Sequence, residues 1–341
     1  MNTKKTGVAF AGNILTDVIK TIDAYPQTGM LCNISEVSQS VGGCVPNTAI
    51  NLAKIDPGLP LSAIGRVGAD EYGRYVTGLL RQYGINTDRI TVSDTEPTSF
   101  TDVMNIRGGE RTFFHARGAN REFAPAHVDI PALDCRILHI GYILLLDAFD
   151  QPDDEYGTVM ARFLHDVQQQ GVKTSVDAVS DSTADYQKTI LPALKYCDYA
   201  ILNEIESTTI WGLSPRTAEG KLHVENIRET MRRMAEAGVR EKVIVHAKEA
   251  GFAFDVATGA FTVVPSLRVP SADIKGSTGA GDAFCAACLY GLYHALPDDE
   301  LLTFASAAAV CNLFADNGID GMRSAEEIRK LETRYERRND I

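Results

Sequence analysis

Residues 276–284 read Gly276-Ser277-Thr278-Gly279-Ala280-Gly281-Asp282-Ala283-Phe284. This stretch follows an extended, proline-containing segment at 269–273 and precedes an apolar segment that predicts a buried helix. Glycines let backbone N–H groups turn toward a ligand, and a helix N-terminus adds partial positive charge at the same place. Such a loop suits a phosphoryl group, and Asp282 in the first helical turn could accept a proton from an attacking hydroxyl. The alternative interpretation is structural, because an acid in the first turn also stabilises an ordinary helix start.

Two familiar nucleotide-binding patterns are missing from the sequence. It contains no G-x-x-x-x-G-K-[ST] segment, and no G-x-G-x-x-G segment follows the first predicted strand. The P-loop and Rossmann classes are therefore disfavoured.

The overall composition is that of a globular protein with an acidic surface. The 341 residues are 45% hydrophobic and 23% charged, which is ordinary for a soluble domain. A formal net charge of -12 argues against a general nucleic-acid or anionic-membrane surface, which would need a basic face. The sequence shows no signal-peptide core and no apolar run of about 20 residues. We therefore expect a cytoplasmic protein.

The cysteines point to reduced thiols. Seven of them, an odd number, are scattered along the chain. Cys285 and Cys288 form a C-x-x-C, but small apolar residues surround them and no second Cys or His pair accompanies them in sequence. We interpret this pair as the small-residue face of a buried helix.

The pattern along the chain predicts an α/β architecture. Short apolar strands near 7–12, 61–65, 137–140, 173–177, 199–202 and 243–246 alternate with amphipathic helices, which favours parallel crossovers and a three-layer fold. Ser99–Ile106 and Arg111–Ala116 are predicted to be two strands joined through a turn at 107–110. A helix is expected at 48–55, before the second strand. Three more helices are expected to close the chain, at about 280–296, 298–316 and 324–337.

The sequence resembles a known family, the ribokinase-like (PfkB-type) carbohydrate kinases. Residues 277–284 are similar to its C-terminal signature, and Gly42-Gly43 with Asn47 resembles its N-terminal one. Further matches follow in the family's order at 64–73, 83–87, 117–120 and 203–206. Because the matches cover nearly the whole chain in order, chance is a poor explanation.

The resemblance implies a fold and a set of partners. It implies one ribokinase-like domain over 1–341, with a mainly parallel central sheet of about eight or more strands between helices. A small β-sheet lid would come from about 17–39 and 99–117. Ligands would lie at the carboxyl ends of the strands, as in other open α/β sheets. The implied partner is a small molecule, most simply a sugar, and the exposed face of the lid leaves a homodimer open.

The resemblance also implies roles for individual residues. Asp282 would be the base, and the N–H groups of Gly279, Ala280 and Gly281 would stabilise the phosphoryl group in transfer. Five residues would bind the substrate: Asp17, Gly42, Gly43, Asn47 and Arg117. Four would face ATP and its Mg²⁺: Asn203, Glu206, Gly251 and Thr278. Lys248 departs from the family pattern and could instead contact phosphate. Glu206 would hold the Mg²⁺ ion, through water.

Several positions depart from the family pattern. Gly276 stands where an Asp that helps to hold a monovalent cation is usual, which leaves K⁺ activation in doubt. His246 and Lys248 stand where a T-x-G pair usually cradles the nucleotide, and Gly251 alone is kept. Leu15 and the segment 138–142 lack the sugar-binding Asn and Glu of ribokinase itself, so ribose is disfavoured.

Three functions therefore compete. The first is an ATP-dependent sugar or sugar-acid kinase. The second is a nucleoside kinase of the same family, for which Leu15 and Tyr142 could face a base. The third is a non-catalytic regulator that binds a sugar or nucleotide; the intact 279–282 segment argues against it, because a pure binder gains nothing from a base.

Overall fold

The structure is a computed structural model that describes residues 5–106 and 111–341. The turn predicted at 107–110 lies outside the described residues. Among those that are described, no helix combines the length and the apolar character needed to cross a membrane.

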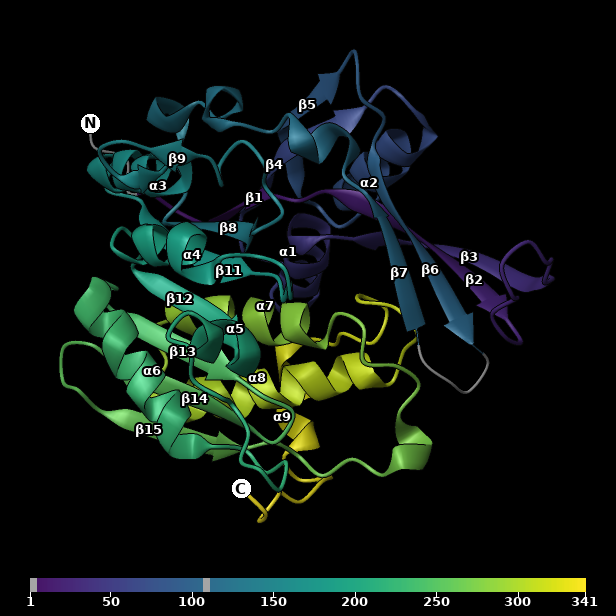
Figure 1. Ribbon diagram of the computed structural model, residues 1–341. Coiled ribbons are helices and arrows are strands. Elements are labelled where there is room, and N and C mark those ends of the chain that lie inside the picture. Colours follow the sequence, from purple (N-terminus) through teal and green to yellow (C-terminus); the bar gives the residue numbers. More distant parts are fainter. Residues whose placement is uncertain (1–4, 107–110) are drawn as a thin grey trace.

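A nine-stranded sheet runs through the centre of the molecule (Figure 1). In spatial order it contains β15 (Phe261–Pro265), β14 (Ala250–Asp255), β13 (Lys242–His246), β12 (Tyr199–Asn203), β11 (Lys173–Ala178), β8 (Ile137–Ile143), β1 (Val8–Gly12), β4 (Leu61–Gly68) and β5 (Asn86–Ser93). The seven strands from β13 to β5 pair in parallel, and β14 and β15 are added antiparallel. The predicted, mainly parallel sheet is confirmed.

Helices cover both faces of this sheet. One face carries α1 (Cys44–Ile55), α2 (Glu71–Gln82), α7 (Ala280–Tyr293), α8 (Asp298–Leu313) and α9 (Ala325–Leu331). The other carries α3 (Val159–Gln169), α4 (Tyr186–Leu194), α5 (Glu204–Thr209) and α6 (Val224–Ala237). Strand β1 shows why two cores form: Val8 and Phe10 pack into the first, whereas Ala9 and Ala11 pack into the second. Side chains alternate across a strand, so a strand buried on both faces is apolar throughout.

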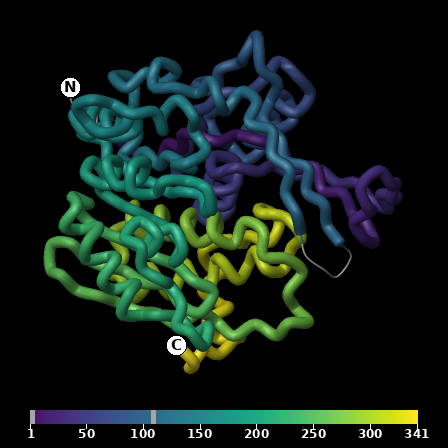
Figure 2. Tube along the Cα trace, viewed as in Figure 1, coloured from purple at the N-terminus to yellow at the C-terminus, as the bar shows by residue number. Residues whose placement is uncertain are grey.

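A second sheet projects from the body. Its four strands lie in the order β3 (Ile34–Gly42), β2 (Leu15–Ile22), β6 (Ser99–Ile106) and β7 (Arg111–Ala116). β2 and β6 pair in parallel although about eighty residues separate them, and Figure 2 shows these purple and blue segments leaving the body together. The two strands predicted at Ser99–Ile106 and Arg111–Ala116 are confirmed. We call this four-stranded sheet the flap.

Other segments are short and connect these elements. They are the 3₁₀ turns η1 (Gly118–Arg121), η2 (Pro125–His127), η3 (Ile130–Ala132) and η4 (Ser271–Asp273), and the small hairpin β9 (Pro152–Asp153) with β10 (Gly157–Thr158).

Several predicted boundaries were wrong. The helix expected to start at residue 48 starts at Cys44, because Gly43 caps it with φ 86° and Pro46 is tolerated in a first turn. The last helix, expected over 324–337, ends at Leu331. The chain beyond it turns at 332–335, and Arg337 then forms a β-bridge with Leu267. Strand β5 was not predicted, because its exposed positions make it polar.

Candidate functional site

The loop before α7, residues 276–279, ends at a left-handed glycine, and we call it the phosphoryl loop after its predicted role. Gly279 caps the helix with φ 74°, and a Cβ there would lie 2.4 Å from Gly318 Cα, so both conformation and space require glycine. The Ala280 N–H donates to the Ser277 carbonyl at 3.2 Å, so it is engaged in a turn in this structure. The helix N-terminus supplies partial positive charge beside the loop.

Asp282 lies buried in the first turn of α7 and is held from two directions. Its Oδ2 accepts a hydrogen bond from Asn47 Nδ2 at 2.9 Å, and its Oδ1 accepts one from the Tyr142 hydroxyl. Burial raises the pKa of Asp282 to about 6, while the hydrogen bonds from Tyr142 and Asn47 act in the opposite direction. The carboxylate therefore ionises near neutral pH, in the range that suits a general base.

Asp17 is the second carboxyl of this region. It lies on β2 in the flap, and a Cβ on Gly42 would come within 2.6 Å of its Oδ2. Burial, followed by the negative charge of Asp282, raises the pKa of Asp17 to about 7, against a hydrogen bond from Thr101. A side chain at residue 42 would therefore collide with the Asp17 carboxyl, and glycine avoids this collision. The neighbouring Gly43 is also restricted, since a Cβ there would lie 2.6 Å from the Asn13 carbonyl oxygen.

Arg111 is a residue that the sequence did not single out. From β7 of the flap it donates to the Thr278 hydroxyl, and its positive charge also acts on Asp17. A Cβ on Gly276 would lie 3.3 Å from its Nη2. The guanidinium thus joins the flap to the phosphoryl loop. Because Gly276 has no side chain, it leaves room for the guanidinium. The sequence contains no signal that Arg111 belongs to the site, because an arginine after a turn is common on protein surfaces.

Arg117 is placed differently from Arg111. Its guanidinium pairs with Asp147, and both side chains are about one third exposed. A role for Arg117 in substrate binding would require this ion pair to be shared or broken. It stays a prediction.

A pair of buried acids extends the site toward β11 and β12. Glu206 is 4% exposed, and burial raises its pKa to about 7. Asp177, at the end of β11, is also buried, and its pKa is raised by burial and by the negative charges of Glu206 and Asp282. Asp177 was missed, although its place at the carboxyl end of a buried strand is a recognisable signal.

Asn203 has a structural task that the sequence pattern did not reveal. Its side-chain oxygen accepts from the N–H groups of Ile205 and Glu206, and its amide donates to Ser180 at 2.9 Å and to Glu206. It therefore caps α5 and fixes the Glu206 carboxylate. Hard oxygen donors of this kind fit Mg²⁺. Burial and the negative charge of Glu206 raise the pKa of Asp177, so a bound cation would stabilise the ionised form of these acids.

A pocket of about 490 Å³ adjoins the phosphoryl loop. Its lining includes His246, Lys248, Ala280, Gly281 and Phe284. The rings of His246 and Phe284 lie 5.0 Å apart, and burial lowers the pKa of His246 to about 4, which keeps the imidazole neutral.

Gly251 lies behind this pocket. A Cβ at residue 251 would lie 3.2 Å from both Leu302 and Phe284. It therefore makes room for the Phe284 ring, and its contact with a nucleotide stays a prediction.

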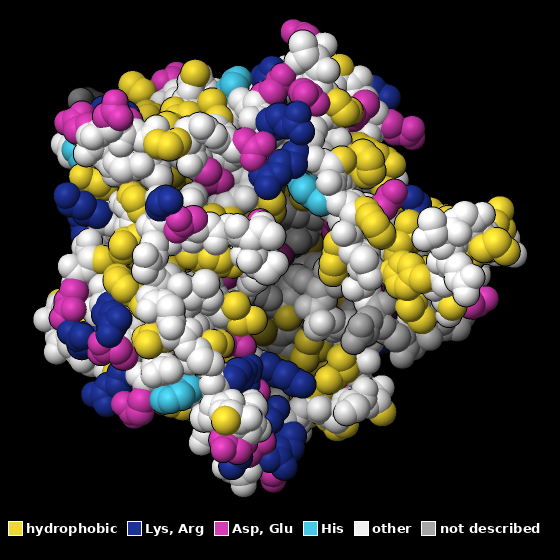
Figure 3. Space-filling model, viewed as in Figure 1, with side chains coloured by type: hydrophobic (Ala, Val, Ile, Leu, Met, Phe, Trp, Pro, Cys, Tyr) yellow, Lys and Arg dark blue, Asp and Glu magenta, His cyan; other side chains and the backbone are white. Residues whose placement is uncertain are grey.

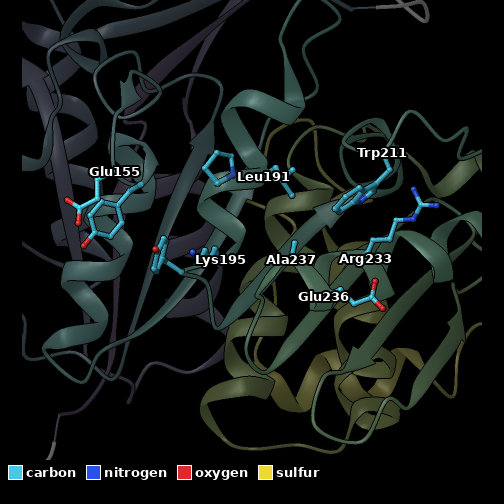
Figure 4. A pocket seen from close by; sticks show the side chains of 10 residues that line it. Glu155, Leu191, Lys195, Trp211, Arg233, Glu236 and Ala237 are labelled. Atoms are coloured by element: carbon cyan, nitrogen blue, oxygen red, sulfur yellow. The ribbon is translucent and has the colours of Figure 1, made fainter.

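A second pocket, of about 510 Å³, lies along α4 and α6 on the outside of the molecule (Figure 4). Its lining includes Tyr196, Trp211, Lys195 and Arg233, and of the described residues predicted for the site it includes none. Three residues predicted for the site, Lys248, Ala280 and Gly281, instead line the first pocket.

Comparison with known proteins decides the family. The model of the pfkB family carbohydrate kinases matches residues 5–324. The chain belongs to this family. The resemblance seen in the sequence is confirmed, and the protein is accordingly a carbohydrate kinase.

Two curated relatives of this pfkB-family chain have different substrates in their names. A 5-dehydro-2-deoxygluconokinase of Listeria monocytogenes is 25% identical over 315 residues, covering 86% of this chain and 87% of the relative. A ribokinase of Arabidopsis thaliana is 24% identical over 322 residues, covering 94% and 79%. The identities are too low for either name to be carried over.

Solved structures confirm the fold of this pfkB-family member. Arabidopsis thaliana ribokinase complexed with ribose and ATP has a TM-score of 0.76 at 22% identity, covering 96% of this chain and 98% of that one. Ribokinase from Thermotoga maritima has a TM-score of 0.77 at 18% identity, covering 96% and 99%. At these identities the likeness shows the fold alone.

Proposed function

We propose that this chain transfers the γ-phosphoryl group of ATP to a hydroxyl of a small sugar or sugar acid, with Asp282 as the base. The substrate oxygen would attack the γ-phosphorus, its proton would pass to Asp282, and the bond from the γ-phosphorus to the ADP oxygen would break. The observation that carries the proposal is the buried Asp282 carboxylate at the positive end of α7, fixed by Asn47 and Tyr142.

The phosphoryl group would lie at the loop before α7. The N–H groups of Gly279 and Gly281 would receive its developing charge, and Ala280 could join them if its turn opened. Arg111 would add a fixed positive charge from the flap, because its guanidinium already reaches Thr278. Closure of the flap would also exclude water, which limits hydrolysis of ATP.

The metal would lie at the buried acids, and the nucleotide would occupy the neighbouring pocket. Glu206 and Asp177 would hold Mg²⁺, directly or through water, and the ion would neutralise phosphate charge. His246, Lys248 and Phe284 would line the nucleotide side. The ATP complex of the Arabidopsis ribokinase, which shares the fold, supports ATP as the donor.

A sugar or sugar acid fits the substrate side better than a nucleoside does. Asp17 and Asn47 offer carboxyl and amide groups, which pair with hydroxyls as donors or acceptors. The Asn47 side-chain oxygen is buried and has no hydrogen-bond partner among residues 5–106 and 111–341, so it can accept a hydrogen bond from a substrate. Tyr142, which could have faced a nucleoside base, directs its hydroxyl to Asp282. The sugar-acid substrate in the name of the Listeria relative supports testing acids first.

The deciding experiment is a coupled ADP-release assay with ATP and Mg²⁺ over a panel of sugars, sugar acids and nucleosides. The same panel is run with the Asp282→Asn variant. It is also run in K⁺ buffer and in tetramethylammonium buffer, which compares turnover with and without K⁺. We expect turnover on one class, lost by at least about 100-fold in the variant. Binding of a sugar or nucleotide without turnover on any member would overturn the kinase proposal in favour of a regulator.

A further inference from the structure

Behind the proposed site, three metal-ligating side chains meet in the core. They are His139 on β8, Asp177 at the end of β11, and Cys285 on α7, one helical turn beyond Asp282. One donor atom from each lies within 4.8 Å of the other two, and all three residues are buried. They come from three separate elements, so only the fold brings them together.

The geometry of His139 is that of a prepared ligand. Its Nδ1 lies 3.0 Å from Ser175 Oγ, and its Nε2 lies 3.6 Å from Cys285 Sγ. If Nδ1 carries the proton and donates it to Ser175, the Nε2 lone pair faces the thiol. A partner on the far ring nitrogen is the usual way in which a metal-binding histidine is oriented.

The spacing and the donor types both fit zinc. Zn²⁺ binds Cys sulfur and His nitrogen at about 2.0–2.3 Å, so two ligands of a tetrahedral ion lie about 3.3–3.8 Å apart. The His139–Cys285 pair already has this separation. Mg²⁺ prefers an octahedron of oxygens and would not choose a thiolate and an imidazole.

We propose that His139, Asp177 and Cys285 form a binding site for Zn²⁺ or a similar thiophilic divalent cation, and that occupancy of this site inhibits the enzyme. The thiol proton of Cys285 and any proton on Asp177 would be released to solvent as the metal binds, which leaves one thiolate, one carboxylate and one neutral imidazole around the ion. The fourth position would take water or the thiol of Cys44, which lies close to this cluster: a Cβ on Gly141 would lie 2.9 Å from Cys44 Sγ and 3.3 Å from Asp177 Cβ.

Inhibition follows from the position of the site. A divalent charge one helical turn from Asp282 would weaken that carboxylate as a base. The same ion would engage Asp177, which the proposed function assigns to Mg²⁺. The inhibitory part of the inference therefore rests on the proposed function, whereas metal binding itself does not.

Binding is tested on the full chain by titrating the EDTA-treated protein with Co²⁺ and following absorbance. We expect one Co²⁺ per chain, with a thiolate-to-cobalt charge-transfer band and the visible bands of a tetrahedral ion. Excess Zn²⁺ should abolish these bands. The Cys285→Ser variant should lose the charge-transfer band and bind at least about 100-fold more weakly, and Ser175→Ala should bind about 10-fold more weakly.

The matched control is Cys288→Ser, which changes an equally buried thiol on the next turn of α7. It should keep the charge-transfer band. Circular dichroism checks that each variant is folded, and His139→Gln gives a second route to the same loss. The site is refuted if the wild-type chain shows no charge-transfer band, or if Cys288→Ser loses it while Cys285→Ser retains it.

A separate arm measures ADP release at rising Zn²⁺ with Mg²⁺ in excess. Wild-type turnover should fall with Zn²⁺, and Cys285→Ala should be at least 10-fold less sensitive. Co²⁺ binding with equal Zn²⁺ sensitivity in both proteins would overturn the inhibitory role alone. Absence of any turnover would instead count against the proposed function, and the absorbance result would still decide the site.

Discussion

The side-chain amide of Asn47 donates to the Asp282 carboxylate at 2.9 Å, across 235 residues of sequence. The contact joins α1 to α7, the two helices whose N-termini meet at the carboxyl end of β1. It fixes the carboxylate without neutralising it, because an amide adds no charge. Substitutions of Asn47 should therefore change the pKa of Asp282.

Asn47→Asp should shift the pH dependence of turnover. A second carboxylate within hydrogen-bond distance disfavours ionisation of Asp282, so its pKa rises and the acid side of the kcat/KM profile moves to higher pH. Activity at pH 7 should fall by about 10-fold or more and recover as the pH is raised. Asn47→Leu, which adds no charge, should lower activity without this recovery. Equal profiles for the two variants would contradict the assignment.

The wild-type profile should itself have an acid limb near pH 6. A carboxyl usually ionises near pH 4, but burial raises the pKa of Asp282 to about 6, so the basic form is lost as the pH falls through that value. Below it, kcat/KM should fall about 10-fold for each pH unit. Asp17, with a pKa of about 7, should steepen the limb if its charge is needed for substrate binding. A profile that stays flat down to pH 4.5 would exclude Asp282 as the base.

Arg111→Met should lower kcat by about 100-fold, because the positive charge of the guanidinium would no longer stabilise the phosphoryl group during transfer. Arg111→Lys should recover part of the rate. The effect should appear in kcat more than in the KM for the sugar. Arg121→Met, which changes an exposed arginine, serves as the control and should behave as wild type. A pure increase in the KM for the sugar would make Arg111 a substrate-binding residue instead.

Gly42→Ala should damage sugar binding selectively. The new Cβ would lie 2.5 Å from Leu15 Cδ1 and 2.6 Å from Asp17 Oδ2, so the Asp17 carboxyl would have to move. We expect the KM for the sugar to rise by at least 10-fold while ATP affinity, measured by calorimetry, stays the same. Gly78→Ala in α2 is a suitable control, since no atom lies within 4 Å of its Cβ position. Loss of ATP affinity in Gly42→Ala would place the defect outside the sugar side.

The flap carries the features of a homodimer interface. Apolar side chains gather on it (Figure 3), and Leu31, Val37, Phe113 and Phe114 are each more than half exposed. Two of its strands, β3 and β7, are also open edges. Sedimentation should therefore detect a dimer, and Val37→Lys with Phe113→Lys should convert it to a monomer. A wild-type monomer at high micromolar concentration would refute this.

Local sequence was enough for much of the fold. The alternation of apolar strands and amphipathic helices predicted the parallel sheet, because each strand buried on both faces must be apolar throughout. The loop at 276–284 was equally readable, since glycine and a helix start have local physical requirements. The errors in the prediction lay at helix ends, such as the start of α1 at Cys44 and the end of α9 at Leu331, because capping residues and the packing of the C-terminal tail decide where these helices begin and end.

The residues around Asp282 show what sequence alone could not decide. The sequence by itself determined the family and the glycine-rich loop before α7, and it predicted Asp282 as the base. Only the tertiary structure brought Arg111 to Thr278, Tyr142 to Asp282, and His139 and Asp177 to Cys285. The physical reason is that a backbone turn depends on neighbouring residues, whereas these side-chain contacts depend on how distant strands and helices pack. Cys285, which belongs to an isolated C-x-x-C in the sequence, therefore gained His139 and Asp177 as neighbours only when the sheet and α7 came together.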